Sequence, residues 1–388
     1  MRTTVTHVHQ EKGLTAVEVG QSIFHPRGGG QPGDSGHLTK IIPGSHQHFR
    51  VVDTRSEAGR LLHFLDTPTL DLVEGDAVEV VRDEGRHQKL TRMHTGEHIL
   101  FGALKRVVKD AVVDKVELDE HESSIFVKAA DDLSIDHLIA AERLANQIVR
   151  ENRSVISHHV DKGSVHEVDG VRIRPERIKE DTVRILEVKD FDKSACCGTH
   201  VSRTHEIGPL LVTKFNAVKK GYYEVRFKLD PVDDLFLFAD ISRRVRALTN
   251  FDYGDITYGI KNLLAERETQ KEKIRELSAN VHVNITEETI DGLTFAYAVF
   301  PGINKRDFIE KINAVNKPDT VLCFINAGER PQIAIRSTNS QNYGAAELLK
   351  QLFQKIHGQG GGSPQLAQGS YEGRKPEEIL TAMRELLQ

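Results

Sequence analysis

The chain has few cysteines, and this shortage narrows the classes of protein to which it can belong. It holds three cysteines in 388 residues, and two of them, Cys196 and Cys197, are adjacent, which is a poor arrangement for a disulfide. A disulfide-stabilised secreted scaffold is therefore not expected, and a reducing cytoplasm is the simplest setting. The third cysteine, Cys323, lies within an apolar stretch and is expected in the core of a strand.

Long apolar runs and an excess of positive charge are also missing. The longest apolar stretches, such as 321–325, fall far short of the roughly 20 residues that a membrane-spanning helix needs. The N-terminus is polar and has no apolar signal region, so neither secretion nor a membrane partner is expected. The net charge of −5 argues against a surface that binds nucleic acid everywhere, although a local basic patch is compatible with it.

Length and patterning predict an α+β protein of several domains, because 388 residues are too many for one ordinary core. Residues 1–85 alternate short strand patterns with Gly and Pro, which favours a small β-barrel or sandwich. Residues 86–230 mix helix and strand patterns, and we expect an α+β zinc domain there. Apolar residues at spacings of three and four predict a helical arm over 231–282. Residues 283–388 are expected to form a C-terminal α/β domain with a Gly-rich segment.

The individual elements follow from the same periodicities. Strands are expected at 4–9, 14–19, 48–53, 60–64, 76–81, 112–118, 124–129, 155–160, 183–188, 293–300, 320–326 and 332–336. Helices are expected at 86–108, 134–152, 305–314, 344–356 and 376–387, with the arm interrupted near 253–254. The Gly-rich stretch 358–369 is expected to be a linker tip or a shaped loop.

Two short motifs together indicate a metal site. His94 and His98 are four residues apart, so they lie on one face of the expected helix. Cys196 and His200 repeat that spacing across a Gly-Thr turn. Three imidazoles and one thiolate suit a tetrahedral zinc ion. The alternative is that the histidines only pack on the helix and the cysteine is a small buried residue. Because both half-sites are present, we predict one zinc ion per chain.

Two further stretches are compatible with a substrate site. The run 24–36 contains Gly28, Gly29 and Gly30, whose backbone can approach a ligand closely, although it lacks the Gly-Lys-Ser/Thr ending of a phosphate-binding loop. Residues 203–228 hold six basic and two acidic residues with Tyr222 and Tyr223 among them, which suits a phosphate-bearing substrate. The alternatives without a functional role are a mobile loop for the first stretch and a solvated β-hairpin for the second.

Four motifs occur in the order that one family shows. They are Gly-Gly-Gly-Gln at 28–31, His-Thr-x-x-His at 94–98, Cys-x-Gly-Thr-His-Val at 196–201 and Gly-Gly-Gly-x-Pro-x-x-Ala-Gln at 360–368. The set resembles the free-standing alanyl-tRNA editing proteins, the AlaX family, in its long form. That family is similar to the editing and C-terminal domains of alanyl-tRNA synthetase. The resemblance covers essentially the whole chain, and the ordered set is far more specific than any motif alone.

The resemblance implies hydrolysis of the ester that joins a wrong amino acid to tRNA(Ala), chiefly serine, with glycine as a second candidate. A synthesis pocket for alanine cannot strongly reject a residue that adds one hydroxyl, so a second site must remove it. The chain opens directly on the barrel, which leaves no room for a class II aminoacylation domain. We therefore expect editing of mischarged tRNA(Ala) without aminoacylation.

The resemblance also assigns roles to residues. His94, His98, Cys196 and His200 match the family's zinc ligands, with His94 and His98 also expected to take part in catalysis. Gln31 matches a pocket-lining glutamine and is expected to contact the serine hydroxyl or the attacking water. Other expected substrate contacts are Gly28, Gly29, Gly30, Thr95, Thr199, Lys219, Lys220 and Arg226, and expected tRNA contacts in the C-terminal loop are Gly360, Gly361, Gly362 and Gln368.

Several points depart from the family or stay open. Cys197 stands where the family commonly has Gly, so it competes with Cys196 as a ligand, and Arg27 and Pro32 flank the glycines and bear on amino-acid selectivity. Glu97 is not placed as in the His-Glu-x-x-His metalloproteases, because it comes three residues after the first His rather than one. A zinc ion held by all four ligands would position substrate, whereas a loose His200 would let it polarise water.

Three other functions compete with editing of tRNA(Ala) as interpretations of this sequence. One is a deacylase acting on Ser-tRNA(Thr), because the editing domain of threonyl-tRNA synthetase is similar. Another is a tRNA-binding module with zinc and no catalysis. A phosphoesterase is disfavoured because Asp136-His137 is followed by Leu138 and the chain has no Asp-His-His. A homodimer through the helical arm and the C-terminal domain is expected.

Overall fold

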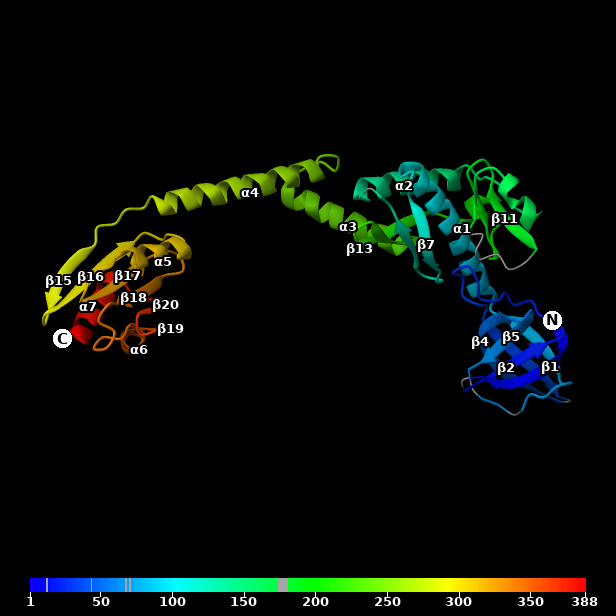
Figure 1. Cartoon of the computed structure of the whole chain (residues 1–388), viewed down its shortest axis with the longest axis horizontal. Coiled ribbons are helices and arrows are strands. Elements are labelled where there is room, and N and C mark those ends of the chain that lie inside the picture. The colour runs from blue at the N-terminus through cyan, green and yellow to red at the C-terminus, as the bar shows by residue number, and fades with distance from the viewer. Residues whose placement is uncertain (12, 43, 67, 70, 131, 174–180) are drawn as a thin grey trace. The chain divides into compact units, whose positions relative to one another are not determined.

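The computed structural model describes residues 1–388 except 12, 43, 67, 70, 131 and 174–180. The chain forms two compact units, Met1–Asp240 and Ile241–Gln388, which are described separately below (Figure 1). Sheets and helices occur in both units, so the expected α+β multidomain class is confirmed. None of the helices in the described residues is long and apolar enough to cross a membrane.

The first unit begins with six antiparallel strands that close into a barrel in the order β1-β2-β5-β4-β3-β6. Alternate residues point inward, and Val17, Leu38, Val51 and Val78 are fully buried in the barrel core. One strand, β3, was not expected, because it directly follows the Gly-rich stretch. The strands are β1 Arg2–Glu11, β2 Leu14–Val19, β3 Gly36–Ile42, β4 Ser45–Glu57, β5 Arg60–Leu65 and β6 Ala77–Arg82.

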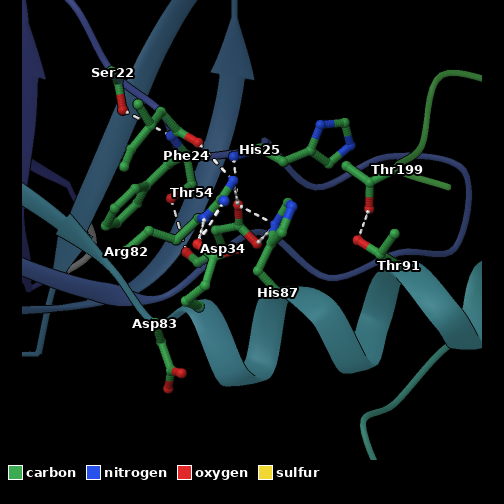
Figure 2. A network of polar contacts seen from close by, with 12 residues as sticks. Ser22, Phe24, His25, Asp34, Thr54, Arg82, Asp83, His87, Thr91 and Thr199 are labelled. Atoms are coloured by element: carbon green, nitrogen blue, oxygen red, sulfur yellow. Dashed lines mark hydrogen bonds and ion pairs between the residues drawn. The ribbon is translucent and has the colours of Figure 1, made fainter. Parts of the chain in front are cut away.

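Helix α1 (Glu84–Val107) follows the barrel and is joined to it by a buried carboxylate (Figure 2). Asp34 is 1% exposed and accepts hydrogen bonds from the His25 backbone N–H at 2.7 Å and from His87 Nδ1 at 3.0 Å. Burial opposes ionisation, but the hydrogen bonds from His87 and His25 outweigh it and lower the pKa of Asp34. The run that contains Gln31 is thereby fixed against the first turn of α1.

The rest of the first unit packs around α1, whose residues from Met93 to Leu104 are buried. One four-stranded sheet has the order β13-β14-β8-β7 and the other β10-β12-β11-β9. Helix α2 (Ile135–Arg150) begins at Ser134, whose hydroxyl accepts from the His137 N–H. The strands are β7 Val112–Glu117, β8 Ser123–Lys128, β9 Val155–Asp161, β10 Val171–Arg172, β11 Thr182–Val188, β12 Asp192–Ala195, β13 Leu210–Lys219 and β14 Tyr222–Leu229, with 3-10 turns at Lys162–Glu167 and Thr204–Ile207.

The expected helical arm is formed by α3 (Val232–Thr249) and α4 (Ile256–Ala279). The boundary between the two units falls inside α3, between Asp240 and Ile241. The predicted interruption near 253–254 is confirmed, because α3 ends at Thr249 and α4 begins at Ile256. Most side chains of α4 are exposed.

The second unit contains a six-stranded sheet in the order β15-β16-β17-β18-β20-β19. Strands β16 and β17 are parallel and are connected by α5, whereas the other neighbours are antiparallel. The remaining bounds are β15 Thr286–Ile290, β16 Leu293–Phe300, α5 Lys305–Ala314, β17 Thr320–Asn326, β18 Gln332–Ser337, α6 Ala345–Lys355, β19 Gly358–Gly362, β20 Leu366–Tyr371 and α7 Pro376–Leu387. Cys323 is fully buried in β17, as expected.

The expectation of a linker tip or loop at 358–369 is wrong. This stretch forms the hairpin of β19 and β20 at the edge of the sheet. Glycine has low strand propensity, which is why the pattern did not indicate strands. Here it is required by close packing, because a Cβ on Gly360 would lie 2.3 Å from the Gln368 carbonyl oxygen and one on Gly358 would lie 2.3 Å from the Phe353 ring.

Asp34→Asn should lower the free energy of unfolding of the first unit by about 1–3 kcal/mol at pH 7, because His87 and the His25 N–H lose a buried charged acceptor. The folded-state pKa of Asp34 is lowered, so its contribution is present above the unfolded pKa of about 4 and is lost as the pH falls through the folded value. Urea denaturation followed at several pH values measures this. The difference from the native chain should shrink in acid. An equal loss from the exposed control Asp71→Asn would contradict the assignment to Asp34.

Candidate metal centre

Four side chains that are distant in sequence converge beside α1. His94, His98, Cys196 and His200 each offer a ligand atom, and these atoms all lie within 4.8 Å of one another. The Cys196 sulfur lies 3.3 Å from His94 Nε2 and 3.2 Å from His200 Nε2. The centroids of the three imidazole rings are 4.4–5.4 Å apart. Three imidazoles and one thiolate at this spacing fit a zinc ion in their donor chemistry.

Each imidazole also has an oxygen on its outer side. Gln31 Oε1 lies 2.8 Å from His94 Nδ1, Asp192 Oδ2 lies 3.4 Å from His98 Nδ1, and Thr95 Oγ1 lies 3.2 Å from His200 Nδ1. In His94 and His200 the oxygen at Nδ1 favours a proton on that nitrogen and leaves Nε2 as the lone-pair donor toward the centre. His98 Nδ1 also lies 3.2 Å from Arg172 Nη2, so Asp192 and a cation share the outer side of this ring. This outer contact is typical of histidines that bind metal ions.

The electrostatics of the four groups favour a bound cation. Burial opposes ionisation of Cys196, but its contacts with His94 and His200 lower the pKa of the thiol well below its usual value. Burial lowers the pKa of His200 to about 3, which keeps this imidazole neutral. His98 behaves differently: burial acts against its protonation, yet the Glu97 charge and the Asp192 hydrogen bond raise its pKa to about 10. A thiolate and a neutral imidazole are the forms that bind metal ions.

Gln31 is fully buried and connects the Gly-rich stretch to both metal-binding motifs. Its Oε1 accepts from His94 Nδ1 and from the Thr199 backbone N–H at 3.0 Å, and its Nε2 donates to Thr199 Oγ1 at 2.9 Å. These bonds use both amide ends inside the protein. The structure therefore places Gln31 behind His94, whereas direct contact with the substrate hydroxyl or water was expected.

The glycines before Gln31 form a tight turn that places the Gln31 side chain against His94. Gly29 and Gly30 have φ of 59° and 91°, and Gly28 and Gln31 exchange two backbone hydrogen bonds of 2.9–3.0 Å. A Cβ on Gly30 would lie 2.6 Å from the Val116 carbonyl oxygen. Gly29 and Gly30 are exposed, so their predicted contact with substrate stays a prediction.

Gly198 is required by the close approach of its loop to α1. A Cβ at this position would lie 2.1 Å from two atoms of the His94 ring and 2.8 Å from Gln31 Oε1. Arg184 holds the same loop from the other side, donating to the carbonyl oxygens of Gly198 at 2.5 Å and Cys196 at 3.2 Å. The loop is thus fixed between β11 and α1.

The other candidate site residues near the four clustered side chains differ in burial and position. Cys196 is buried within the cluster, whereas Cys197 is exposed and is not among the clustered ligands of the described residues. Thr95 is fully buried behind His200, so it is not on the open side, but Thr199 is half-exposed. Glu97 is 4% exposed, and one of its carboxylate oxygens lies 3.8 Å from His98 Nε2.

Asp192 and Arg172 were missed by sequence reasoning. Arg172 donates to Asp192 through Nε at 3.0 Å and through Nη2 at 2.7 Å, and Asp192 in turn faces His98. Although burial acts the other way, His98 and Arg172 lower the pKa of Asp192 to about 2. The two residues meet because β10 pairs with β12, and no local spacing in the sequence indicates that pairing.

Other expected site residues lie away from the four ligands. Lys219 and Lys220 are exposed at the turn between β13 and β14, and Arg226 pairs with Glu224 on β14. In the second unit, Gly360, Gly361 and Gln368 line a cavity of about 620 Å³ with Lys305 and Phe308, while Gly362 is not among its lining residues. Their contacts with tRNA stay predictions.

Comparison with known proteins gives one match to a short segment and several matches to nearly the whole chain. Residues 183–223 match the family described as "Threonyl and Alanyl tRNA synthetase second additional domain". The chain is 26% identical over 410 residues to the alanyl-tRNA editing protein AlaX-L of Pyrococcus horikoshii, covering 99% of this chain and 94% of that protein. It is 28% identical over 386 residues to the alanine–tRNA ligase of Cenarchaeum symbiosum, covering 96% of this chain but only 41% of the ligase.

Gly198→Ala should displace the loop from His94 and weaken metal binding by about 10- to 100-fold, the range seen when the surroundings of ligands are disturbed. Gly28→Ala is the matched control in the same site, because a Cβ there would meet nothing within 4 Å and its φ is not positive. Metal content after dialysis against a graded zinc buffer measures both variants. Equal zinc retention by the two variants would contradict the steric role of Gly198.

Proposed function

The chain is AlaX-like, as its four motifs predicted, and from this premise we propose that it hydrolyses mischarged Ser-tRNA(Ala) at a zinc centre. Glycine on the same tRNA is the second candidate substrate. The observation that carries the proposal is the convergence of three imidazoles and the Cys196 thiolate, with a separate oxygen at each imidazole Nδ1. A set of residues that only packed in the core would not need this arrangement.

We propose His94, His98, Cys196 and His200 as the ligands of one zinc ion. When bound, zinc supplies a Lewis acid that polarises an ester carbonyl or lowers the pKa of a water molecule. The protein groups set the geometry around it: Gln31 holds His94, Thr95 holds His200, and Asp192 holds His98. His200 and Thr199 are half-exposed, which supports an approach of the ester from their side.

Selectivity for serine requires a polar group that faces the amino acid. We propose Thr199 for this role instead of Gln31, because Gln31 is fully buried and both ends of its amide are bonded within the protein. Thr199 Oγ1 is held by Gln31 Nε2 and lies 2.7 Å from Thr91 Oγ1. A fixed hydroxyl can bond the serine side chain and has no counterpart in alanine, which protects the correct product.

Ser-tRNA(Thr) is the alternative substrate that one observation favours. The family that matches 183–223 is described for threonyl as well as alanyl synthetases. The similarity to AlaX-L over 99% of the chain supports the alanine system, so tRNA(Ala) remains the proposed acceptor.

Cys196→Ala should reduce release of labelled serine from Ser-tRNA(Ala) by at least about 100-fold, because it removes a metal ligand. The matched control is Cys197→Ala, which removes the neighbouring thiol that lies outside the cluster and should retain activity. Ala-tRNA(Ala) and Ser-tRNA(Thr) are measured alongside, and both should be cleaved more slowly by the native chain.

Three outcomes would count against this proposal. Failure of the zinc-loaded native chain to cleave either seryl ester would support a binding module without catalysis. Equal cleavage of Ser-tRNA(Ala) and Ala-tRNA(Ala) would keep the hydrolase and remove the role of Thr199. Loss of activity in Cys197→Ala but not in Cys196→Ala would transfer the ligand role to Cys197. The expectation that the chain does not aminoacylate is tested in parallel with free alanine and ATP.

We also propose that the chain forms a homodimer through α4. Leu263, Ile274 and Leu277 are exposed and project from one face of this helix. Exposed apolar residues aligned along a helix are typical of helix–helix association.

The double variant Ile274→Asp/Leu277→Asp should therefore shift the chain to a monomer in analytical ultracentrifugation. Ala265→Asp places one negative charge on the opposite face of the same helix and should leave the dimer intact, whereas Ile274→Asp alone, with the same added charge, should weaken it. A native chain that sediments as a monomer would disprove the dimer, and equal dissociation in both single variants would remove its assignment to this face.

A further inference from the structure

The sheet β13-β14-β8-β7 has one face packed on the helices and one face that carries basic and aromatic side chains. On the packed face, Tyr223, Val225 and Phe227 of β14 are buried in the main core. Alternate residues point the other way. We call this other side the outer face. Strand pairing aligns its residues in three rows: Lys214, Arg226, Ser124 and Glu117; then Asn216, Glu224, Phe126 and Lys115; then Lys219, Tyr222 and Lys128.

Two aromatic rings lie at the centre of the outer face. The centroids of Phe126 and Tyr222 are 6.1 Å apart, and their planes differ by 23°. The Tyr222 hydroxyl donates to Asp114 at 3.1 Å, which fixes that ring. Both rings are half-buried, so their edges are held by the sheet while part of each ring stays accessible.

Flexible cations surround these rings. The ammonium of Lys115 lies 5.5 Å from the centroid of Phe126, and those of Lys128 and Lys219 lie 6.0 Å and 5.6 Å from the centroid of Tyr222. All three lysines are exposed on long side chains. Lys115 and Lys128 form ion pairs with Glu117 and Asp114, but such exposed pairs contribute little and can exchange for a phosphate. Fixed aromatic rings with mobile cations beside them are the combination that binds single-stranded nucleic acid, because bases stack on the rings and phosphates meet the cations.

The outer face has a surplus of positive charge, although the whole chain carries −5. Its acidic residues are engaged with cations: Asp114 with Lys128, Glu117 with Lys115, and Glu224 with Arg226. The surplus comes from Lys214 and Lys219, for which the described residues show no ion pair, and from Lys220 at the adjoining turn. An anionic partner is therefore favoured over a cationic or a purely apolar one.

The outer face adjoins the metal centre. The first row ends at Glu117, and the next residue, Leu118, donates its backbone N–H to the Gly30 carbonyl oxygen at 3.0 Å. Gly30 precedes Gln31, whose amide contacts His94. A chain whose last residue is held at the metal centre can thus continue over the row that contains Phe126 and then the row that contains Tyr222.

From this placement we propose that the outer face binds the unpaired 3′ strand of the tRNA, with bases stacked on Phe126 and Tyr222 and phosphates near Lys115, Lys128 and Lys219. The proposal rests on the proposed function for the identity of the RNA. In addition to the metal centre, the outer face would position the ester by binding the nucleotides that precede it.

The first test is binding of a short single-stranded RNA ending in CCA, labelled at its 5′ end and followed by fluorescence anisotropy with the full chain. Phe126→Leu and Tyr222→Leu keep an apolar side chain and remove the ring, and each should weaken binding about 10-fold. Phe215→Leu is the matched control. Its ring lies 5.5 Å from that of Tyr223, with planes also differing by 23°, but on the packed face. It should bind RNA as the native chain does.

The second test separates the surface from the chemistry. In the ring variants, kcat/KM should fall further for Ser-tRNA(Ala) than for the seryl ester of adenosine, which lacks the stacked bases. Lys115→Ala/Lys219→Ala should reduce the magnitude of the slope of log affinity for the RNA against log salt by about 1.4, because two cations stop meeting phosphates of a single strand.

The outcomes distinguish this proposal from the editing function. If both ring variants bind the RNA as tightly as the native chain, the outer face is not the RNA surface, even if Ser-tRNA(Ala) is hydrolysed. An equal loss of binding in Phe215→Leu would also overturn it, because the effect would then come from general disturbance of the sheet. If neither ester is hydrolysed but RNA binding depends on Phe126 and Tyr222, the editing function fails and the surface stands.

Discussion

The arrangement of the metal centre depends on one buried amide. Gln31 accepts from His94 Nδ1 and from the Thr199 N–H, and donates to the Thr199 hydroxyl. These three bonds join the Gly-rich turn, helix α1 and the loop that carries Cys196 and His200. Water does not compete for them because the side chain is fully buried. Since the amide oxygen faces two donors and the amide nitrogen faces a hydroxyl, the amide orientation and the His94 tautomer are set together.

This bridge requires two other contacts to be in register. Asp34 comes three residues after Gln31, and His87 comes seven before His94, close to two helical turns. Their hydrogen bond therefore fixes the run that carries Gln31 along the axis of α1. Gly198 allows the second loop to approach from the other side, where any side chain would meet His94. The barrel thus contributes to the site by holding one glutamine, and none of its described residues belongs to the cluster of four side chains.

Local periodicity made much of the molecule predictable. The four-residue spacings of His94 with His98 and of Cys196 with His200 indicated the four side chains that cluster, and the apolar patterns predicted β2, β16, β17, α5 and α7 at their observed bounds. Strand β19 was missed because its glycines are selected by close packing against β20 and not by strand propensity.

The surroundings of the ligands were not predictable for a different reason. Asp192 reaches His98 only because β12 pairs with both β10 and β11, and pairing between strands distant in sequence has no local signature. Gln31 was recognised as part of the site, but its role depends on burial. A glutamine in a Gly-rich stretch looks the same in sequence whether it faces a substrate or a histidine.

The charges at the centre explain why these residues suit a cation and not merely a polar core. The Cys196 thiolate, Asp192 and Glu97 all lie close to His98, while Arg172 is the cation paired with Asp192. Their combined attraction for positive charge raises the pKa of His98 to about 10, despite its burial. A divalent ion held by these four side chains would receive the same attraction. Asp192 lies outside the cluster of four side chains, where Arg172 holds it on the Nδ1 side of His98.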